Sequence, residues 1–323
     1  MSDLFGNLKP KGGVKGFDPA TGIPSLEGKV IFITGGTTGL GAESVRALAA
    51  HTPLHIYFSG RNTTAGEALT TEIKSAHPNV GLTFVQIDQS SLASVKSAVK
   101  KNFIHDRLDI LLNNAGIMAQ PAALSKDGYE IQFATNHLGH AMLTQQLLPK
   151  LLNAAQAPHS DVRIINLTSE GFRLHEARGI CFDELDAGSV MSRKVLGAWV
   201  RYGQSKLANI LFAAEFARRY PQITSVSVHP GVVKTDLVNK QTFTNKLLIH
   251  GPMWLSGQKM VEKHEGAYNQ LWCAAGAKKE QVRNGSYYMP VGSESYESLD
   301  KVAKDEKLAG RLWDWTEGVL AKF

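Results

Sequence analysis

The sequence predicts an α/β protein with one doubly wound parallel sheet of about seven strands and helices on both faces of the sheet. Short, nearly continuous apolar runs recur along the chain, as is typical of strands that are buried on both faces. Segments with helical apolar periodicity separate these runs, and the alternation of strands and helices implies parallel βαβ units. A glycine-rich stretch joins the first run to the first helical segment, which is common in such sheets.

The apolar runs are the predicted strands. In chain order they span residues 29–34, 54–60, 81–88, 108–116, 162–169 and 223–231, and a seventh strand is predicted near 285–292. The intervening segments place apolar residues on one helical face, for instance Val45, Leu48 and Ala49. Because the chain shows no internal repeat or interdomain linker, we predict a single domain at 28–323, with an irregular N-terminal arm at 1–27 and a C-terminal extension at 291–323.

Two stretches interrupt the alternation. Residues 170–198 are longer than an ordinary loop, and residues 232–262 follow the last central strand and carry large apolar side chains such as Met253 and Trp254. Long segments at the carboxyl ends of strands are often lids or binding loops. We therefore expect a substrate lid at 232–262, with an ordinary packed helical excursion as the alternative.

Composition and charge argue against several classes of protein. The formal net charge is +6, but basic and acidic residues are mixed, unlike the clustered Lys and Arg of nucleic-acid-binding proteins. No apolar run is long enough to span a membrane, and the N-terminus lacks the apolar core of a signal peptide. Two distant cysteines, Cys181 and Cys273, suit a reducing compartment. We expect a cytoplasmic protein with no nucleic-acid or membrane partner.

Two catalytic classes lack their motifs. His137 and His140 share a helical face, but no glutamate completes the H-E-x-x-H frame of a zinc enzyme. They are better read as packing or polar residues, and no metal site is predicted. A Ser-His-Asp hydrolase on this fold would need a G-x-S-x-G elbow, which the chain does not contain.

The glycine stretch "TGGTTGLG", residues 34–41, predicts a pyrophosphate-binding loop. Glycines let the backbone approach the anion, and the following helix presents free N–H groups to it. A tight strand–helix turn without a ligand is the alternative, and the absence of a Gly-Lys-Ser/Thr ending rules out a P-loop. The residues predicted to line the cofactor here are Gly35, Thr37, Thr38, Gly39, Leu40 and Gly41.

Arg61 indicates which nicotinamide cofactor the loop would take. About twenty residues past such a loop an Asp or Glu usually holds the ribose 2′-hydroxyl. The second strand instead ends in "YFSGRN", and an arginine there can bind a 2′-phosphate with two hydrogen bonds. This favours NADPH/NADP+ over the unphosphorylated cofactor, the alternative being an Arg61 that only faces solvent.

Tyr202 and Lys206 are the candidate acid–base pair. Residues four apart lie on one helical face, and a nearby ammonium lowers the pKa of a tyrosine. Ser169 ends the 162–169 strand at the edge where open α/β sheets bind ligands, and its hydroxyl could orient a carbonyl oxygen beside the tyrosine. A helix cap or turn residue is the alternative role for this serine. The small residues after the 108–112 run, including Asn114, Ala115 and Gly116, would let a cofactor lie against the backbone.

These motifs together resemble the short-chain dehydrogenase/reductase family. The matching stretches, in family order, are T-G-x-x-x-G-x-G at 34–41, N-N-A-G at 113–116, Asn136 in T-N-H-L-G-H, Ser169, Y-x-x-x-K at 202–206, and P-G…T within 229–237. The resemblance covers roughly residues 28–290 and is greatest to the retinol-dehydrogenase-like branch and related fungal-type reductases. It implies a Rossmann-type sheet.

The resemblance also implies roles for individual residues. Tyr202 would be the acid–base and Lys206 would tune it and bind the nicotinamide ribose, so both would also contact the cofactor. Ser169 would orient the substrate oxygen, and Asn136 would hold a water that relays protons. The remaining cofactor contacts would be Asp88 near the adenine, the Pro230, Gly231 and Val233 stretch over the nicotinamide, and Thr235 at its carboxamide.

The expected function is NADPH-dependent reduction of apolar or aromatic ketones and aldehydes, or oxidation of the corresponding secondary alcohols. A non-catalytic NADP(H)-binding regulator or scaffold on the same fold is the alternative, although such a protein would usually lack Tyr202, Lys206 or Ser169. The membrane anchor common in the retinol-dehydrogenase-like branch is missing. The long 170–198 gap and the C-terminal tail leave both a homodimer and a monomer open.

Overall fold

An eight-stranded sheet runs through the described part of the computed structural model, which comprises residues 13–185, 196–234 and 260–323. The strand order is β3-β2-β1-β4-β5-β6-β7-β8, and neighbouring strands are parallel except β7 and β8. The strands are β1 (Val30–Ile33), β2 (His55–Gly60), β3 (Gly81–Gln86), β4 (Ile110–Asn113), β5 (Arg163–Leu167), β6 (Thr224–Val228), β7 (Tyr287–Met289) and β8 (Ser293–Glu294).

The predicted doubly wound sheet is confirmed, and all seven predicted strands are present. The chain runs outward from β1 to β3 and then crosses back to β4, so the strand order reverses between β1 and β4. In open α/β sheets the ligand crevice lies at the carboxyl ends of the strands at this reversal. The eighth strand, β8, was not predicted because it is two residues long and antiparallel, which leaves no periodic signal in the sequence.

Both faces of the sheet are buried, as the continuous apolar runs predicted. In β1 the side chains of Val30 and Phe32 enter one hydrophobic core, whereas Ile31 and Ile33 enter the other. All four are fully buried. A strand with this environment gains apolar burial from every residue, because successive side chains point to opposite faces.

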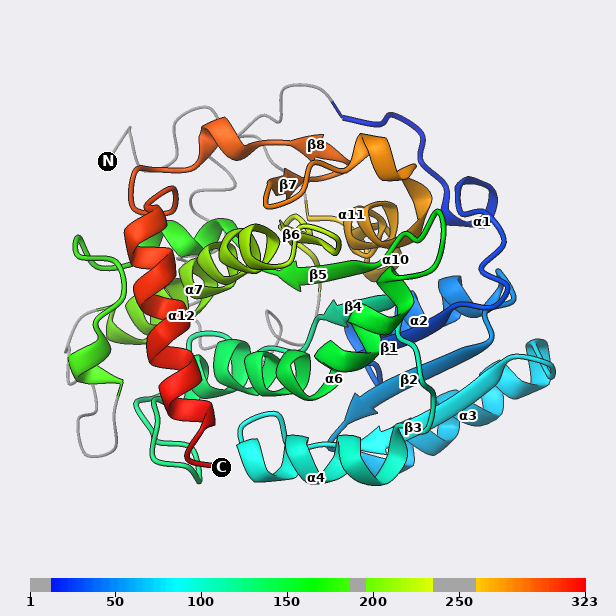
Figure 1. Cartoon of the computed structure of the whole chain (residues 1–323), viewed down its shortest axis with the longest axis horizontal. Helices are drawn as coiled ribbons and strands as arrows, with labels where there is room; N and C mark the ends of the chain where they lie inside the picture. Colours follow the sequence, from blue (N-terminus) through cyan, green and yellow to red (C-terminus); the bar gives the residue numbers. More distant parts are fainter. Residues whose placement is uncertain (1–12, 186–195, 235–259) are drawn as a thin grey trace.

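One face of the sheet is covered by the helices α4 (Leu92–Asn102), α6 (Gly139–Ala155), α7 (Gly197–Arg219) and α12 (Glu306–Leu320), whose apolar residues share a core (Figure 1). The α6 helix continues from α5 (Ile131–Phe133) through the π-helical turn η1 (Ala134–Leu138). The C-terminal helix α12 lies against α7, where Trp313 stacks on Phe212 with ring centroids 5.3 Å apart. The predicted C-terminal extension therefore packs onto the helix that carries Tyr202.

The opposite face is covered by α2 (Gly39–Ala49), α3 (Thr63–Ala76), α11 (Tyr268–Leu271) and the π-helical turn η4 (Trp272–Gly276). The short helix α10 (Lys263–Gly266) precedes α11, and α1 (Pro19–Gly22) lies near η4. The described part of the predicted N-terminal arm, residues 13–27, buries Ile23 and Leu26 in this core. Residues 1–12 of that arm lie outside the described residues.

Short 3-10 helices form much of the long connection after β5. They are η2 (Glu170–Leu174) and η3 (Phe182–Glu184), and residues 186–195 of the same connection lie outside the described part. Two further 3-10 turns, η5 (Lys279–Gln281) and η6 (Tyr296–Ser298), flank β7 and β8.

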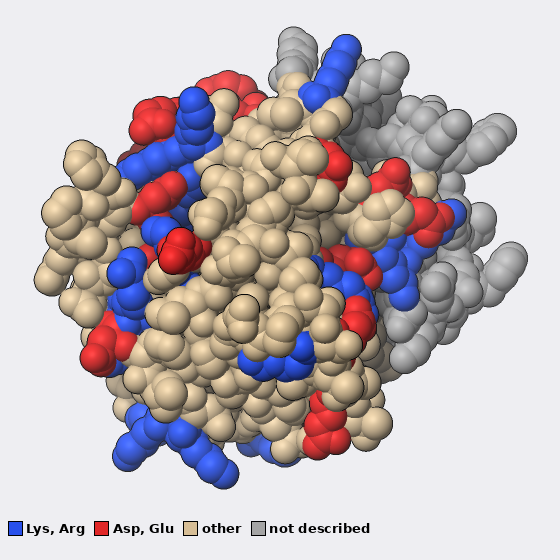
Figure 2. Space-filling view, turned by 90° about the vertical axis from the view of Figure 1, so that its right-hand side faces the viewer, with Lys and Arg blue, Asp and Glu red and all other residues tan. Residues whose placement is uncertain are grey.

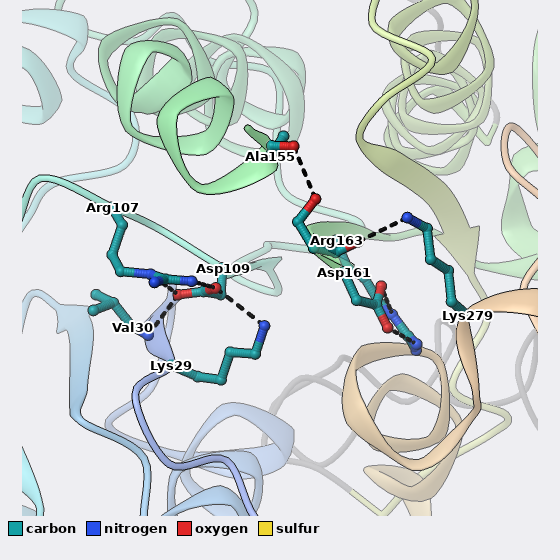
Figure 3. Close-up of polar contacts among 9 residues, drawn as sticks. Lys29, Val30, Arg107, Asp109, Ala155, Asp161, Arg163 and Lys279 are labelled. Atoms are coloured by element: carbon teal, nitrogen blue, oxygen red, sulfur yellow. Dashed lines mark hydrogen bonds and ion pairs between the residues drawn. The ribbon is translucent and has the colours of Figure 1, made fainter. Parts of the chain in front are cut away.

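Charged side chains hold the amino-terminal edge of the sheet together (Figure 3). The carboxylate of Asp109 is fully buried, and it accepts hydrogen bonds from the Val30 backbone N–H at 2.9 Å, from Lys29 at 3.2 Å and from Arg107. The Arg163 guanidinium pairs with Asp161 and donates to two backbone carbonyls of the segment after α11. The first set of contacts joins the starts of β1 and β4, and the second fastens the start of β5 to the η4 segment, on the opposite edge from the predicted site.

Charges on the surface are mixed. On the face shown in Figure 2, the described Lys and Arg side chains alternate with Asp and Glu over a mostly uncharged surface. Among the described helices none is both long and apolar enough to cross a lipid bilayer. The cytoplasmic location stays a prediction.

Candidate active site

The glycine loop between β1 and α2 has the backbone that the sequence predicted. Gly35 and Gly39 have φ angles of +64° and +57°, in the left-handed region that glycine tolerates best. A Cβ atom at Gly41 would lie 2.2 Å from the Gly35 carbonyl oxygen, so the loop closes on itself at that point. Nothing lies within 4 Å of a Cβ at Gly39, which leaves that backbone accessible at the start of α2. This bare, tightly turned backbone fits a pyrophosphate.

The loop is joined to the end of β4 through Thr34. Its hydroxyl oxygen accepts hydrogen bonds from the backbone N–H groups of Asn114 and Ala115, both at 2.9 Å. The Asn114 side chain donates to the Thr34 carbonyl at 2.8 Å. A Cβ at Gly35 would lie 3.0 Å from the Ala115 Cα. The two predicted cofactor segments, 34–41 and 114–116, are therefore one continuous surface at the strand-order reversal.

Arg61 and Asp88 lie at the carboxyl ends of β2 and β3, near the glycine loop. Arg61 is exposed, and Thr37 lies against the neighbouring Gly60, whose added Cβ would be 2.7 Å from the threonine side chain. Burial raises the pKa of Asp88, but hydrogen bonds from Ser90 and the charges of Lys126 and Arg61 hold that pKa below its ordinary value. Asp88 is therefore an anion beside a guanidinium, at the end of the crevice where an adenosine would lie.

Tyr202 and Ser169 come together across the start of η2. Tyr202 is 7% exposed, in the first half of α7. A Cβ at Gly171 would lie 2.8 Å from the Tyr202 ring and 3.4 Å from the Ser169 hydroxyl oxygen, so only a glycine fits between them. Burial raises the pKa of Tyr202 to about 12, opposed by a hydrogen bond with Ser169. The phenol is therefore protonated at neutral pH, unlike the sequence-based expectation of a pKa lowered by Lys206.

Lys206 is one helical turn further along α7, and its ammonium group is 5.8 Å from the centre of the Tyr202 ring. It donates a hydrogen bond to the Leu167 carbonyl at 3.0 Å, two residues before Ser169. Burial lowers the pKa of Lys206 to about 8. The ammonium also lies near Gly116, where an added Cβ would be 3.5 Å from it. Lys206 thus spans the space between the tyrosine and the 114–116 segment.

Asn136 lies in the π-helical turn η1, and its side-chain amide makes three hydrogen bonds. The amide oxygen accepts from the Ile117 N–H at 2.8 Å, and the amide nitrogen donates to the Ile117 carbonyl and to the Ser205 hydroxyl. These bonds fasten the segment after Gly116 to the turn before α6. Both amide hydrogens are therefore used within the protein.

The stretch after β6 contacts the glycine loop. Val233 is buried, and its side chain and that of Leu40 both lie against Gly266, where a Cβ would be 2.5 Å from Val233 and 2.8 Å from Leu40. Gly231 has a φ of +88°. Val233 pairs with Val261 in a short parallel bridge, so the two ends of the predicted 232–262 lid meet. Thr235, Met253, Trp254 and the rest of 235–259 lie outside the described residues.

Several residues that shape this site were not predicted from the sequence. Ser205 holds the Asn136 amide, and Gln270 of α11 donates to Ser44 at 2.7 Å beneath the glycine loop. The Thr168 hydroxyl donates to the Lys206 carbonyl at 2.8 Å. Such residues act through hydrogen bonds that close only in the folded chain. Within the described residues, no group of three or more His, Cys, Asp or Glu side chains could hold a metal ion.

Comparison with known proteins agrees with this geometry. Residues 29–180 match the family model described as short chain dehydrogenase. A short-chain dehydrogenase/reductase of Aspergillus calidoustus is 37% identical over 93% of this chain and 96% of its own length. Human retinol dehydrogenase 11 is 33% identical over 91% of this chain and 86% of its own length.

The fold also matches solved structures. A crystal structure of a Mycobacterium paratuberculosis protein superposes with a TM-score of 0.71 at 28% identity, covering 95% of this chain and 98% of the other. The similarity thus extends beyond residues 28–290, which carry the motifs. With its doubly wound sheet and these relatives, the chain belongs to the short-chain dehydrogenase/reductase family, in the branch of the retinol-dehydrogenase-like and fungal enzymes.

Proposed function

We propose that the protein is an NADPH-dependent carbonyl reductase, reversible as an alcohol dehydrogenase, with Tyr202, Lys206, Ser169 and Asn136 as its working residues. The observation that carries the proposal is the arrangement around Tyr202. The Tyr202 ring and the Ser169 hydroxyl oxygen lie 2.8 and 3.4 Å from the same Cβ position at Gly171, and the Lys206 ammonium lies 5.8 Å from the ring centre. A buried phenol with an orienting hydroxyl and a cation nearby is suited to proton exchange with a carbonyl oxygen.

In the reductive direction Tyr202 acts as the general acid. Residues 114–116 would hold the nicotinamide of the cofactor, which would supply the hydride. The Ser169 hydroxyl hydrogen-bonds the substrate oxygen and holds it beside the phenol, and Tyr202 donates its proton to that oxygen. The Lys206 ammonium then stabilises the tyrosinate, because an opposite charge in a buried site is only weakly screened. In the oxidative direction the same groups run the proton transfer in reverse.

Asn136 would complete the route by which Tyr202 regains its proton. Its amide is committed to Ile117 and Ser205, so we assign the water-binding role to its main-chain carbonyl. The amide keeps the turn rigid, and the carbonyl offers a lone pair for a water between Lys206 and solvent. The proton would then return to Tyr202 through this water, in a site that otherwise excludes solvent.

Arg61 supports the choice of NADPH. Its exposed guanidinium lies at the end of β2, where a ribose 2′-phosphate would accept charge-assisted hydrogen bonds. Asp88, held ionised by Ser90 and nearby cations, suits the neutral adenine at the same end. The Pro230–Val233 stretch, packed through Gly266 against Leu40, suits the nicotinamide end, where Thr235 is the proposed partner of the carboxamide.

The substrate class is supported by apolar side chains beside Tyr202. Ala119, Trp199 and Tyr202 form a small buried cluster, and Met118, Leu174 and Ala198 pack against it. The Trp199 and Tyr202 rings meet edge to face at 6.2 Å. An apolar surface next to the proton donor favours apolar or aromatic ketones, aldehydes and secondary alcohols over charged substrates.

The test follows NADPH absorbance with purified protein and a broad panel of carbonyl compounds, beside the Tyr202→Phe variant. We expect turnover of apolar carbonyls that falls roughly a hundredfold or more in the variant, because a positioned proton donor contributes that much. Tight NADPH binding with identical, background rates in both proteins would instead identify a non-catalytic NADP(H)-binding protein. A wild-type protein that bound neither NADPH nor NADH would contradict both the proposed reductase and the non-catalytic NADP(H)-binding protein.

A further inference from the structure

His140 bridges the cofactor loop and the turn that carries Asn136. Its ring is 3% exposed, on the first turn of α6. One ring nitrogen, Nε2, is 2.8 Å from the Thr34 hydroxyl oxygen, and the other, Nδ1, is 2.9 Å from the Asn136 carbonyl oxygen. Sequence patterning suggested only a packing or polar role for this residue. The structure gives both of its nitrogens a partner in the proposed active site.

The partners determine where the protons lie. The Asn136 carbonyl can only accept, so Nδ1 carries the hydrogen. The Thr34 oxygen already accepts from two backbone N–H groups, which use its two lone pairs. Its own hydrogen therefore points to Nε2 at 2.8 Å rather than to the more distant Leu112 carbonyl at 3.4 Å. Every group in this chain of hydrogen bonds is satisfied in one arrangement.

We propose that His140 is a positioning residue that couples cofactor binding to the Asn136 turn, acting as a neutral imidazole with its hydrogen on Nδ1. The imidazole fixes the Thr34 hydroxyl, which in turn holds the backbone of Asn114 and Ala115 where a nicotinamide cofactor would lie. The same ring donates a hydrogen bond to the Asn136 carbonyl and thereby orients the turn that carries it. This inference rests on the proposed function.

A charged imidazole would break the arrangement. A hydrogen on Nε2 would point at the Thr34 oxygen, which has no lone pair left to accept it. Burial lowers the pKa of His140 to about 4, and the Lys206 ammonium acts in the same direction. The ring therefore stays neutral while Lys206 carries the positive charge of this region.

The experiment compares His140→Phe with His137→Phe. His137 is also buried, but it bonds Thr316 of α12 at 2.9 Å and packs edge to face against Phe133 and Phe212. We expect His140→Phe to raise the NADPH dissociation constant about tenfold and also to lower kcat, because the buried Thr34 hydroxyl and Asn136 carbonyl each lose a hydrogen bond. His137→Phe should change thermal stability but leave the dissociation constant within about twofold. His140→Gln, which keeps one donor and one acceptor, should recover part of the NADPH affinity.

Nitrogen-15 NMR of the wild-type protein tests the proton positions without activity or cofactor. We expect His140 to remain neutral, with its hydrogen on Nδ1, from pH 8 down to about pH 5.5, since burial lowers its pKa to about 4. Hydrogen on Nε2, or unchanged NADPH affinity in a folded His140→Phe protein, would overturn the proposal. If His140→Phe does not fold, the Gln variant and the NMR spectrum decide. A wild-type protein that binds neither NADPH nor NADH would contradict the proposed function. The proton positions found by NMR would still test the proposal for His140 independently.

Discussion

In the proposed mechanism, Tyr202 and Lys206 differ in protonation from what their spacing alone predicts. The four-residue spacing correctly predicted that they share a helical face, but it did not include the cost of burial. Burial raises the pKa of Tyr202 to about 12 and lowers that of Lys206 to about 8. The tyrosine therefore starts as a protonated acid, and the titrating group near neutrality is the lysine.

The pH dependence of reduction follows from Lys206. Below pH 8 its charged form predominates, and above pH 8 the neutral amine does, because its pKa is about 8. We expect kcat/KM for NADPH-driven reduction to decline as the pH rises through about 8, with Tyr202 protonated throughout. Rate measurements between pH 6 and 10 check this. Lys206→Met should be slower and lack the inflection, and a profile shared by both proteins would assign the decline to another group.

Arg61 should control the choice between the two nicotinamide cofactors. Arg61→Asp removes the proposed partner of the 2′-phosphate and adds a repelling charge. We expect at least roughly thirtyfold weaker NADPH binding, about 2 kcal/mol, with NADH affinity nearly unchanged. Fluorescence titration with both cofactors measures the difference. Equal weakening of both would mean that the guanidinium has no role at the phosphate.

Residues that belong to a sequence motif could be predicted, whereas the residues that hold them in place through hydrogen bonds could not. The spacing of Gly35, Gly39 and Gly41 predicts a turn, because a tight strand–helix turn needs residues without a Cβ at these positions. Ser205, Gln270 and His140 have no such spacing, because each finds its partner across the fold. Thr235 and the apolar residues of 232–262 stay predictions.

At the level of elements, the active site depends on a close approach between α7 and η2. The helix backbone at Gly203 touches the η2 segment so closely that a Cβ would lie 2.8 Å from both the Leu174 carbonyl carbon and the His175 nitrogen. A second close contact between the two elements is that of Gly171 in η2 with the Tyr202 ring in α7. Two glycines thus set the distance between the strand that ends near Ser169 and the helix that carries Tyr202.

Gly203→Ala should separate these elements. We expect a loss of about 1–3 kcal/mol in the free energy of unfolding and a clear drop in kcat, because the methyl group must displace backbone. Gly310→Ala in α12 is the matched control, since its Cβ meets nothing within 4 Å. That change should be neutral or stabilising by up to about 1 kcal/mol. Urea unfolding and steady-state rates of both variants distinguish the outcomes; similar values would mean that the η2 contact is easily relaxed.

Regular elements were predictable to the extent that they carry a long apolar period. The six long runs gave β1 to β6, and helices such as α2 and α4 followed from their buried stripes. The turns η2 and η3 have too few residues for a period, and the π-helical turn at Asn136 differs from an α-helix by one residue in its bonding. Their conformations follow from contacts with α7 and Ile117 rather than from local sequence.

Across the whole molecule, the two edges of the sheet have different tasks. The carboxyl edge carries glycines, Ser169 and the other proposed reactive groups, whereas the amino edge carries Asp109 and Arg163 with their bonds to neighbouring backbone. The charged contacts that stabilise the amino edge therefore lie apart from the proposed reactive groups. We expect a substitution among those contacts to change the stability of the protein without changing its rate.

Asp109→Ala tests that separation. It leaves the Val30 N–H without its acceptor and Lys29 and Arg107 without their anion, so we expect a loss of about 2 kcal/mol or more. The rate per folded molecule should not change. Asp106→Ala is the control, because its ion pair with Lys150 involves a carboxylate that is 92% exposed and contributes about 1 kcal/mol or less. Thermal unfolding with rates measured well below Tm checks both; a large drop in kcat for Asp109→Ala would link the two edges.

The bridge between Val233 and Val261 bears on how such a chain can diversify. The two backbones exchange hydrogen bonds from Lys234 to Val261 and from Val261 to Val232, so the two ends of the segment between them are held together. Adding residues between joined ends costs little closure entropy, since each doubling of length adds only about 0.6 kcal/mol. A change in the number of residues between these valines would therefore cost little in closure entropy. Segments of different length can be carried at this point of the fold for a small loss of stability.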